Sequence, residues 1–250
     1  MEQRTLEIEL TYYRKKYQLN QEDICSGICS VAKLSRLEQG YREIDSLIGE
    51  SLLGRIGKEI TLFELLLNEE DYDLWKKRKA IQNYVENKNL ENAEKCIREY
   101  RRVMPAGEAV HEQFCMYEEV LIMLQRQKSV EILCQKLEES IKLTIPEFKS
   151  ANEKVRLYNQ IEIEMILLLF RYDTFSNDIM EKELLKILTH VKKYFSQRKK
   201  EEIGIKILFE LIEHANYKKY YKKVVDYAEE AINLIREGKR FRFSGYWTNR

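Results

Sequence analysis

Apolar side chains recur every three or four residues along almost the whole chain, which is the spacing of one face of an α-helix. Leu6, Leu10, Tyr13 and Tyr17 form the first such stripe. Residues that favour helix N-caps and glycines that end helices then alternate closely. They predict four more short helices, the last over 62–67. The N-caps are expected at Asn20, at Ser30, at Asp45 or Ser46, and at Thr61. The glycines near which these helices are expected to end are Gly27, Gly40, Gly54 and Gly57.

The pattern changes near Asp71, where long amphipathic stretches begin. They come in pairs that are separated by short polar turns and repeat about every 40 residues, which is typical of a helical-repeat solenoid. A helical domain without true repeats is the alternative. The predicted pairs are 74–87 with 90–103, 109–127 with 130–142, 151–172 with 178–195, and 200–216 with 220–237.

The composition excludes several other classes of protein. The chain of 250 residues has only 2 prolines and 9 glycines, too few turn formers for a many-stranded β-sandwich or barrel. No glycine-rich dinucleotide-binding or phosphate-binding motif occurs. No apolar run reaches about 18 residues, the length that spans a membrane. The first residues also lack the basic and apolar regions of a signal peptide. We therefore expect an all-α, cytoplasmic protein without a membrane span.

Two short helices joined by a tight turn within about 20 residues have the geometry of a helix-turn-helix. Residues 19–40 have the sequence LNQEDICSGICSVAKLSRLEQG. The L-x-Q-x-x-(apolar) opening and the S-R-L-E-x-G close resemble the XRE, or lambda-repressor-like, family of DNA-binding domains. The resemblance covers about residues 5–66. It departs from many family members at Cys25, where alanine is usual. The turn also looks one residue shorter than in phage repressors, as in the multidomain, peptide-responsive regulators of the PlcR and Rgg type.

This resemblance implies a DNA-binding domain of five helices whose third helix, 30–37, lies in the major groove. Leu34 and Leu37 are expected in the core, and Gln21 matches a position whose amide contacts the DNA backbone and braces the third helix. The predicted DNA contacts are Gln21, Ser30, Val31, Ala32, Lys33, Ser35, Arg36, Arg14 and Arg42, with Lys15 and Lys16 as further candidates for phosphate contacts.

The net charge of +1 does not by itself indicate a nucleic-acid partner. Over residues 11–42, however, 6 basic residues stand against 3 acidic ones, so the expected DNA-binding face is locally positive. Ordinary solvated charge at Lys33 and Arg36, and simple helix capping by Ser30, are the alternatives to DNA contact.

The long-helix region carries a second resemblance. Residues 220–234, YYKKVVDYAEEAINL, resemble the second helix of a tetratricopeptide repeat, and residues 89–97 are a weaker copy. Residues 238–247, GKRFRFSGYW, stand where another first helix is expected. Either this tail folds back as an aromatic cap, or a partner covers it, or the chain is truncated.

The predicted domains are a helix-turn-helix DNA-binding domain over 1–68 and a tetratricopeptide-like solenoid over 69–250 for dimerisation and ligand sensing. The resemblance implies a transcriptional regulator that binds double-stranded DNA as a homodimer and responds to a signalling peptide. Asn152, Asn159 and Asn216 are candidate peptide clamps, because a side-chain amide both donates and accepts hydrogen bonds.

Catalysis, metal binding and other cofactors are not expected. No catalytic motif occurs, and the three histidines, His111, His190 and His214, lie far apart and are expected on exposed helix surfaces. The cysteines are expected to be reduced, small buried hydrophobes; they are Cys25, Cys29, Cys96, Cys115 and Cys134. The alternative function is a protein-interaction scaffold whose helix-turn-helix does not read DNA. The acidic sum of residues 1–66, 9 basic against 11 acidic, favours it.

Overall fold

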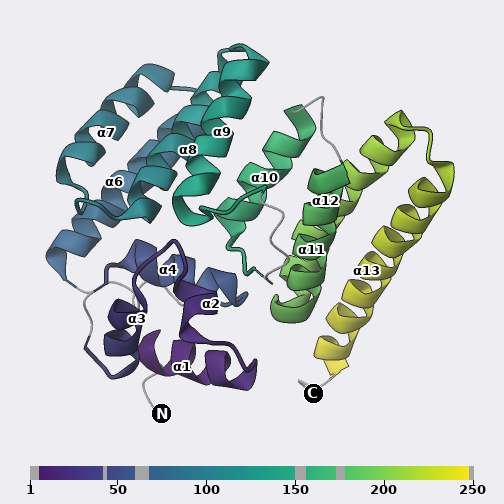
Figure 1. Ribbon diagram of the computed structural model, residues 1–250, viewed down its shortest axis with the longest axis horizontal. Helices are drawn as coiled ribbons and strands as arrows, with labels where there is room; N and C mark the ends of the chain where they lie inside the picture. Colours follow the sequence, from purple (N-terminus) through teal and green to yellow (C-terminus); the bar gives the residue numbers. More distant parts are fainter. Residues whose placement is uncertain (1–5, 42–43, 60–67, 150–155, 173–177, 248–250) are drawn as a thin grey trace. The chain divides into compact units, whose positions relative to one another are not determined.

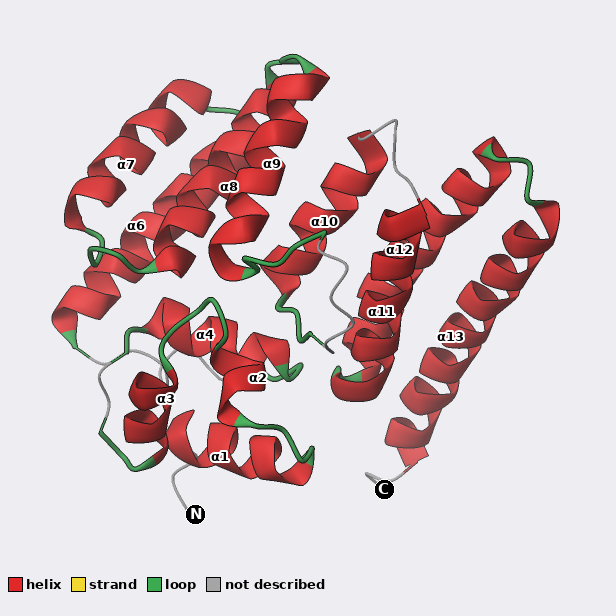
Figure 2. Ribbon diagram, in the orientation of Figure 1, coloured by secondary structure: helices red, strands yellow, loops and turns green. Residues whose placement is uncertain are grey.

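The computed structural model describes residues 6–41, 44–59, 68–149, 156–172 and 178–247. Within these ranges every regular element is an α-helix and no strand occurs (Figures 1 and 2). The predicted all-α class is therefore confirmed. The fifth short helix, predicted over 62–67, lies outside the described residues.

The chain forms two compact units, 1–169 and 170–250. The first unit holds four short helices, two long hairpins and most of the next helix; these are α1 (Leu6–Lys16), α2 (Gln21–Cys25), α3 (Val31–Glu38), α4 (Ser46–Arg55), α6 (Glu69–Glu86), α7 (Leu90–Val103), α8 (Ala109–Gln125), α9 (Val130–Thr144) and α10 (Gln160–Tyr172). The second unit holds α11 (Asp178–Tyr194), α12 (Gln197–Tyr217) and α13 (Tyr221–Trp247).

Local capping signals set the starts of the short helices as the sequence predicts. Ser30 Oγ accepts a hydrogen bond from the backbone N–H of Lys33 at 3.1 Å. The carboxylate of Asp45 accepts from the N–H groups of Leu47 and Ile48 at 2.9 and 3.1 Å. Each cap satisfies N–H groups that have no partner within the first helical turn.

Helix α10 begins at Gln160, nine residues later than predicted, because a capping box fixes its start. Asn159 Oδ1 accepts from the N–H of Glu162 at 2.9 Å, and Glu162 Oε2 accepts from the N–H of Asn159 at 2.7 Å. Residues 156–159 are accordingly not helical.

For helix α13 the prediction differs from the structure at the other end of the helix, where the predicted end is too early. The sequence predicts an end before Gly238, whereas the helix continues to Trp247 (Figure 1). A glycine inside a helix costs only about 1 kcal/mol of helix stability relative to alanine, so it does not by itself end the helix.

The long helices pack as consecutive pairs, which are α6 with α7, α8 with α9, and α12 with α13. Helix α11 packs on α12.

Helix α4 is the common core of the first unit. Eight of its ten residues are buried. It contacts α1 and α2 among the short helices and α6 and α8 among the long ones. A helix that is covered on nearly all sides belongs to an interior.

A buried polar cluster holds the start of α4. The N–H and the hydroxyl of Ser46 both donate to Asp71 Oδ1 in α6, at 3.1 and 2.8 Å. Arg78 Nη2 donates to Ser46 Oγ at 3.0 Å. Asp45, the cap of α4, places Oδ2 2.9 Å from Nε2 of His111 in α8. Two long helices are thus bound to one helix end.

Arg55 holds the other end of α4. Its Nη1 donates to the carbonyl oxygens of Ile24 and Ser26, at 2.9 and 2.6 Å. Its Nη2 donates to the carbonyl of Thr144, where α9 ends, at 3.0 Å and to Glu162 Oε1 in α10 at 2.7 Å. Both members of the Arg55–Glu162 pair are at most 3% exposed. This one guanidinium joins the α2–α3 connection to α9 and α10.

The backbone also approaches closely at this junction. Gly27 has a φ of +75°, and a Cβ placed on it would lie 2.0 Å from the carbonyl oxygen of Thr144. Glycine meets both requirements. Because the short helices and the first hairpins share this core, the first compact unit extends past the predicted division at residues 68 and 69 to Leu169.

The carboxyl side chain of Glu118 in α8 is buried, with 3% exposure. Burial raises its pKa to about 7; a hydrogen bond with Gln82 and the charge of Lys79 act against this, and the charges of Glu86 and Glu164 act with it. The folded protein therefore holds this proton at pH values where the unfolded chain has lost it.

Replacing Arg55 by methionine is expected to destabilise the protein by about 3–5 kcal/mol, because it leaves the carboxylate of Glu162 buried without its partner. Urea unfolding followed by circular dichroism measures this change. Arg102→Met on the exposed face of α7 is the matched control and should change stability by less than about 0.5 kcal/mol. Equal effects of the two substitutions would contradict the anchoring role of Arg55.

Glu118→Gln is expected to stabilise the protein at pH 8 by up to about 3 kcal/mol, at about 1.4 kcal/mol for each unit between 4.5 and about 7. Since the folded pKa is the higher one, wild-type stability falls as the pH rises from 4.5 to 7, and the two proteins should converge near pH 4. Urea unfolding at several pH values tests this. The exposed Glu139→Gln is the control. A gain that does not vary with pH would show that titration is not its cause.

Candidate nucleic-acid interface

Helix α3 divides into an inner and an outer face. Leu34 and Leu37 are fully buried, as predicted. Val31, Ala32 and Arg36 are exposed on the other side. The outer face therefore combines an apolar side chain, a small one and a guanidinium within two turns of one helix.

The connection between α2 and α3 is fixed by contacts with α4 and with the end of α9. Arg55 binds the carbonyl of Ser26, and Gly27 lies against the end of α9. Ser30, the last residue of the connection, is exposed, and its hydroxyl oxygen accepts the hydrogen bond that caps α3. Ser35 is half-buried on α3. The orientation of α3 is thus fixed by contacts on the side away from its outer face.

The guanidinium of Arg14 is bound by other groups of the chain and is not a solvated charge on this outer face. Its Nε and Nη2 donate to the two oxygens of Glu38 at 2.6 and 2.7 Å, and its Nη1 donates to the carbonyl of Leu19 at 3.1 Å. The hydrogen bond to Glu38 raises the pKa of Arg14. This two-pronged pair binds α1 to the end of α3 and leaves little of the guanidinium for a phosphate.

Gln21 shares the same carboxylate. Its Nε2 donates to Glu38 Oε2 at 2.9 Å, so the amide at the start of α2 braces the end of α3. Burial acts to raise the pKa of Glu38, but the hydrogen bonds from Arg14 and Gln21 outweigh it and hold that pKa below its usual range. Glu38 is charged at neutral pH and holds three elements together.

Lys33 is paired with a residue far along the chain. Its Nζ lies 2.6 Å from Oε1 of Glu108, the residue that precedes α8, and each side chain is about one-fifth exposed. The predicted base or phosphate contact is therefore neutralised by a partner in the same compact unit.

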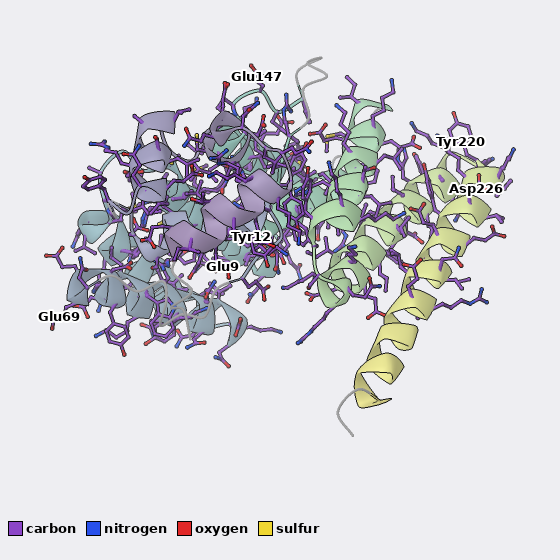
Figure 3. All side chains as sticks on the ribbon, turned by 90° about the horizontal axis from the view of Figure 1, so that it is seen from below. Glu9, Tyr12, Glu69, Glu147, Tyr220 and Asp226 are labelled. Carbon is purple, nitrogen blue, oxygen red and sulfur yellow. The ribbon has the colours of Figure 1, made fainter. Side chains whose placement is uncertain are left out.

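The remaining basic candidates lie on or near α1. Lys15 and Lys16 are exposed, and Lys16 Nζ stands 5.6 Å from the ring centroid of Tyr12, one of the side chains labelled in Figure 3. Lys58, which the sequence did not single out, stands 4.1 Å from the ring centroid of Tyr13. Arg42 lies outside the described residues.

The candidate peptide clamps lie in different local surroundings. Asn159 is buried and caps α10, so its amide oxygen is occupied. Asn216 is exposed near the end of α12 in the second unit. Asn152 lies outside the described residues. Burial of Asn159 and the use of its Oδ1 in the capping box leave this side chain little room to clamp a peptide.

The histidine expectation is wrong in part. His111 is fully buried, with Nε2 at Asp45 and Nδ1 2.6 Å from the hydroxyl of Tyr100. His190 is buried as well. Cys25 and Cys115 are buried as predicted, while the other three cysteines are partly exposed. No group of three His, Cys, Asp or Glu side chains that could hold a metal occurs among the residues placed in the structure.

Comparisons of the chain with protein-family models, with curated proteins and with solved structures gave no match. In the described part of the chain, no helix combines the length and apolar character needed to cross a membrane. Any functional assignment therefore depends on the residues themselves.

Proposed function

We propose that the protein is a sequence-specific DNA-binding transcriptional regulator. In this proposal α2 and α3 form a helix-turn-helix of the XRE type, α3 enters the major groove, and the long helices form a tetratricopeptide-like domain that dimerises and senses a ligand. The resemblance of residues 19–40 to the XRE family motivates it.

The outer face of α3 is the observation that carries the proposal. A helix that buries only Leu34 and Leu37 while it offers Val31, Ala32 and Arg36 to solvent suits insertion into a groove. Arginine is suited to guanine edges or phosphates, and an apolar side chain to a thymine methyl group. Lys15 and Lys16 supply exposed positive charge on α1 for phosphates.

DNA binding in this form requires an exchange at Lys33. The ammonium group leaves Glu108 and gains a phosphate or base oxygen. Because the existing pair is partly exposed, breaking it costs about 0–1 kcal/mol. Glu108 then remains near the phosphates as an unfavourable charge unless it moves away.

Dimerisation would place two copies of α3 on half-sites about one helical turn of DNA apart. A signalling peptide or another ligand would act by binding the long-helix domain more tightly in one arrangement of the DNA-binding parts than in another. Among the described residues, the exposed Asn216 is a candidate clamp for such a ligand.

A protein-interaction scaffold is the second candidate function. The engagement of Lys33 by Glu108, and of Arg14 and Gln21 by Glu38, favours it, since three predicted DNA contacts are satisfied within the chain. Such a protein would bind DNA only through general charge attraction.

Arg36→Ala is expected to weaken binding to a selected sequence by about 5- to 100-fold, the range for losing one good base contact. The DNA is first selected from a random double-stranded library with the purified full chain, and affinities are measured by fluorescence anisotropy at fixed salt. Lys33→Ala should also weaken binding.

Lys95→Ala, an exposed lysine on α7, is the matched control and should bind like wild type. Failure of the library to yield a preferred sequence, or wild-type affinity in an Arg36→Ala/Lys33→Ala double variant, would reject sequence-specific recognition by α3 and favour the scaffold.

Glu108→Gln is expected to strengthen DNA binding about 2- to 10-fold, because it frees Lys33 and removes a negative charge near the phosphates. Glu139→Gln on α9 controls for the change in net charge. The gain should shrink in a Lys33→Ala background. A gain of the same size with and without Lys33 would show that the ion pair does not compete with DNA.

A further inference from the structure

Helix α13 carries a second apolar stripe that stays largely exposed among the described residues of its unit. Tyr221, Val225, Ala228, Ile232 and Ile235 follow one another by four, three, four and three residues, which is a heptad pattern. Apart from the half-buried Ala228, these side chains are between 37% and 64% exposed. Figure 3 labels Tyr220, the residue directly before this helix, and Asp226 within it.

The side of α13 that packs on α12 includes Leu234, which does not belong to this stripe. Leu234 is buried, and its Cδ1 lies so near Gly204 of α12 that a Cβ there would stand 2.9 Å away. A surface helix needs only one apolar face to pack. Most of the stripe is therefore exposed beside the contact with α12, and contiguous exposed apolar side chains mark interaction sites.

Charged side chains border the stripe on one flank only. Lys222, Glu229 and Arg236 are exposed and stand seven residues apart, so they form one row of alternating sign. The other flank carries the uncharged Val224 and Ala231, both half-buried. This asymmetry decides which pairings of two such helices are electrostatically favourable.

We propose that the stripe of α13 is the docking face for α13 of a second copy of this chain, in antiparallel orientation. The inference deepens the proposed function, which calls for a dimer, but its test needs no DNA. A two-fold axis makes every contact occur twice, with the same patch used on both copies.

Charge distinguishes registers of this pair that differ by one heptad. In antiparallel helices, like flanks face each other. Setting Val225 against Ala228 of the second copy brings Tyr221 against Ile232 and Lys222 against Glu229. A shift by one heptad sets Ala228 against Ile232 but brings Glu229 against Glu229 of the second copy. Opposite charges across the interface favour the first register, and like charges disfavour the second.

A parallel pair gains nothing from the charged row. In that orientation the charged flank of one helix faces the uncharged flank of the other, so Lys222 and Glu229 meet valine and alanine side chains. The alternating row is thus explained by self-association in the antiparallel orientation.

Sedimentation velocity on the full chain, without DNA and over a concentration series, tests the proposal. Wild type is expected to dimerise, and Ile232→Glu to raise the dissociation constant at least about tenfold, since it places a carboxylate in the apolar contact. Ile132→Glu, at an isoleucine on α9 that is 57% exposed against 46% for Ile232, is the matched control and should dimerise like wild type.

A charge exchange tests the register. Lys222→Glu and Glu229→Lys should each weaken dimerisation several-fold, because each sets like charges opposite one another twice. The double variant should recover to within about threefold of wild type. All four positions substituted are exposed, so circular dichroism should report unchanged helicity.

A monomeric wild type, or an Ile232→Glu variant that dimerises like wild type, would overturn the docking face. Lack of recovery in the double variant would overturn the antiparallel register. A dimer that binds no preferred DNA sequence would leave this face intact and reject only the proposed function.

Discussion

The fold of the first unit depends on the buried hydrogen bonds of Arg55. Its guanidinium bonds to the backbone carbonyls of Ser26 and Thr144 and to the carboxylate of Glu162, so three segments that are distant in sequence meet at one side chain. Burying an ion pair costs desolvation free energy, which is recovered only when the geometry is good and the other hydrogen bonds are satisfied. Those requirements fix the end of α4, the start of α10 and the connection before α3 relative to one another.

The contacts of Gly27 and Arg55 also bear on how α3 is presented. They bind the α2–α3 connection to the end of α9, while the outer face of α3 is exposed. Direct contacts through Arg55 therefore join the start of α10 to the connection before α3. Glu162 is at once the capping residue of α10 and the partner of Arg55, so the same carboxylate sets a helix boundary and a tertiary contact.

Sequence reasoning located most helices because their signals are local. Caps such as Ser30 act within three residues, and heptad-like apolar spacing acts within one helix. It missed the start of α10 although the Asn159-x-x-Glu162 box is visible in the sequence, and it gave Gly238 too much weight. The candidate interface was harder, because Glu108 is 75 residues from Lys33 and no local pattern links the two. The buried state of His111 depends on Asp45, another contact between distant segments.

The two carboxylates that engage the predicted DNA contacts differ in kind. Glu38 is almost buried, accepts two hydrogen bonds from Arg14 and one from Gln21, and so belongs to the framework that positions α3. Glu108 is more exposed and meets a single flexible ammonium group. Breaking the contacts of Glu38 would disturb the packing of α1 on α3, whereas breaking the Lys33–Glu108 pair would leave α1 and α3 in place. If α3 binds DNA as proposed, a phosphate can replace Glu108 at Lys33, whereas Arg14 and Gln21 would act through the position of α3.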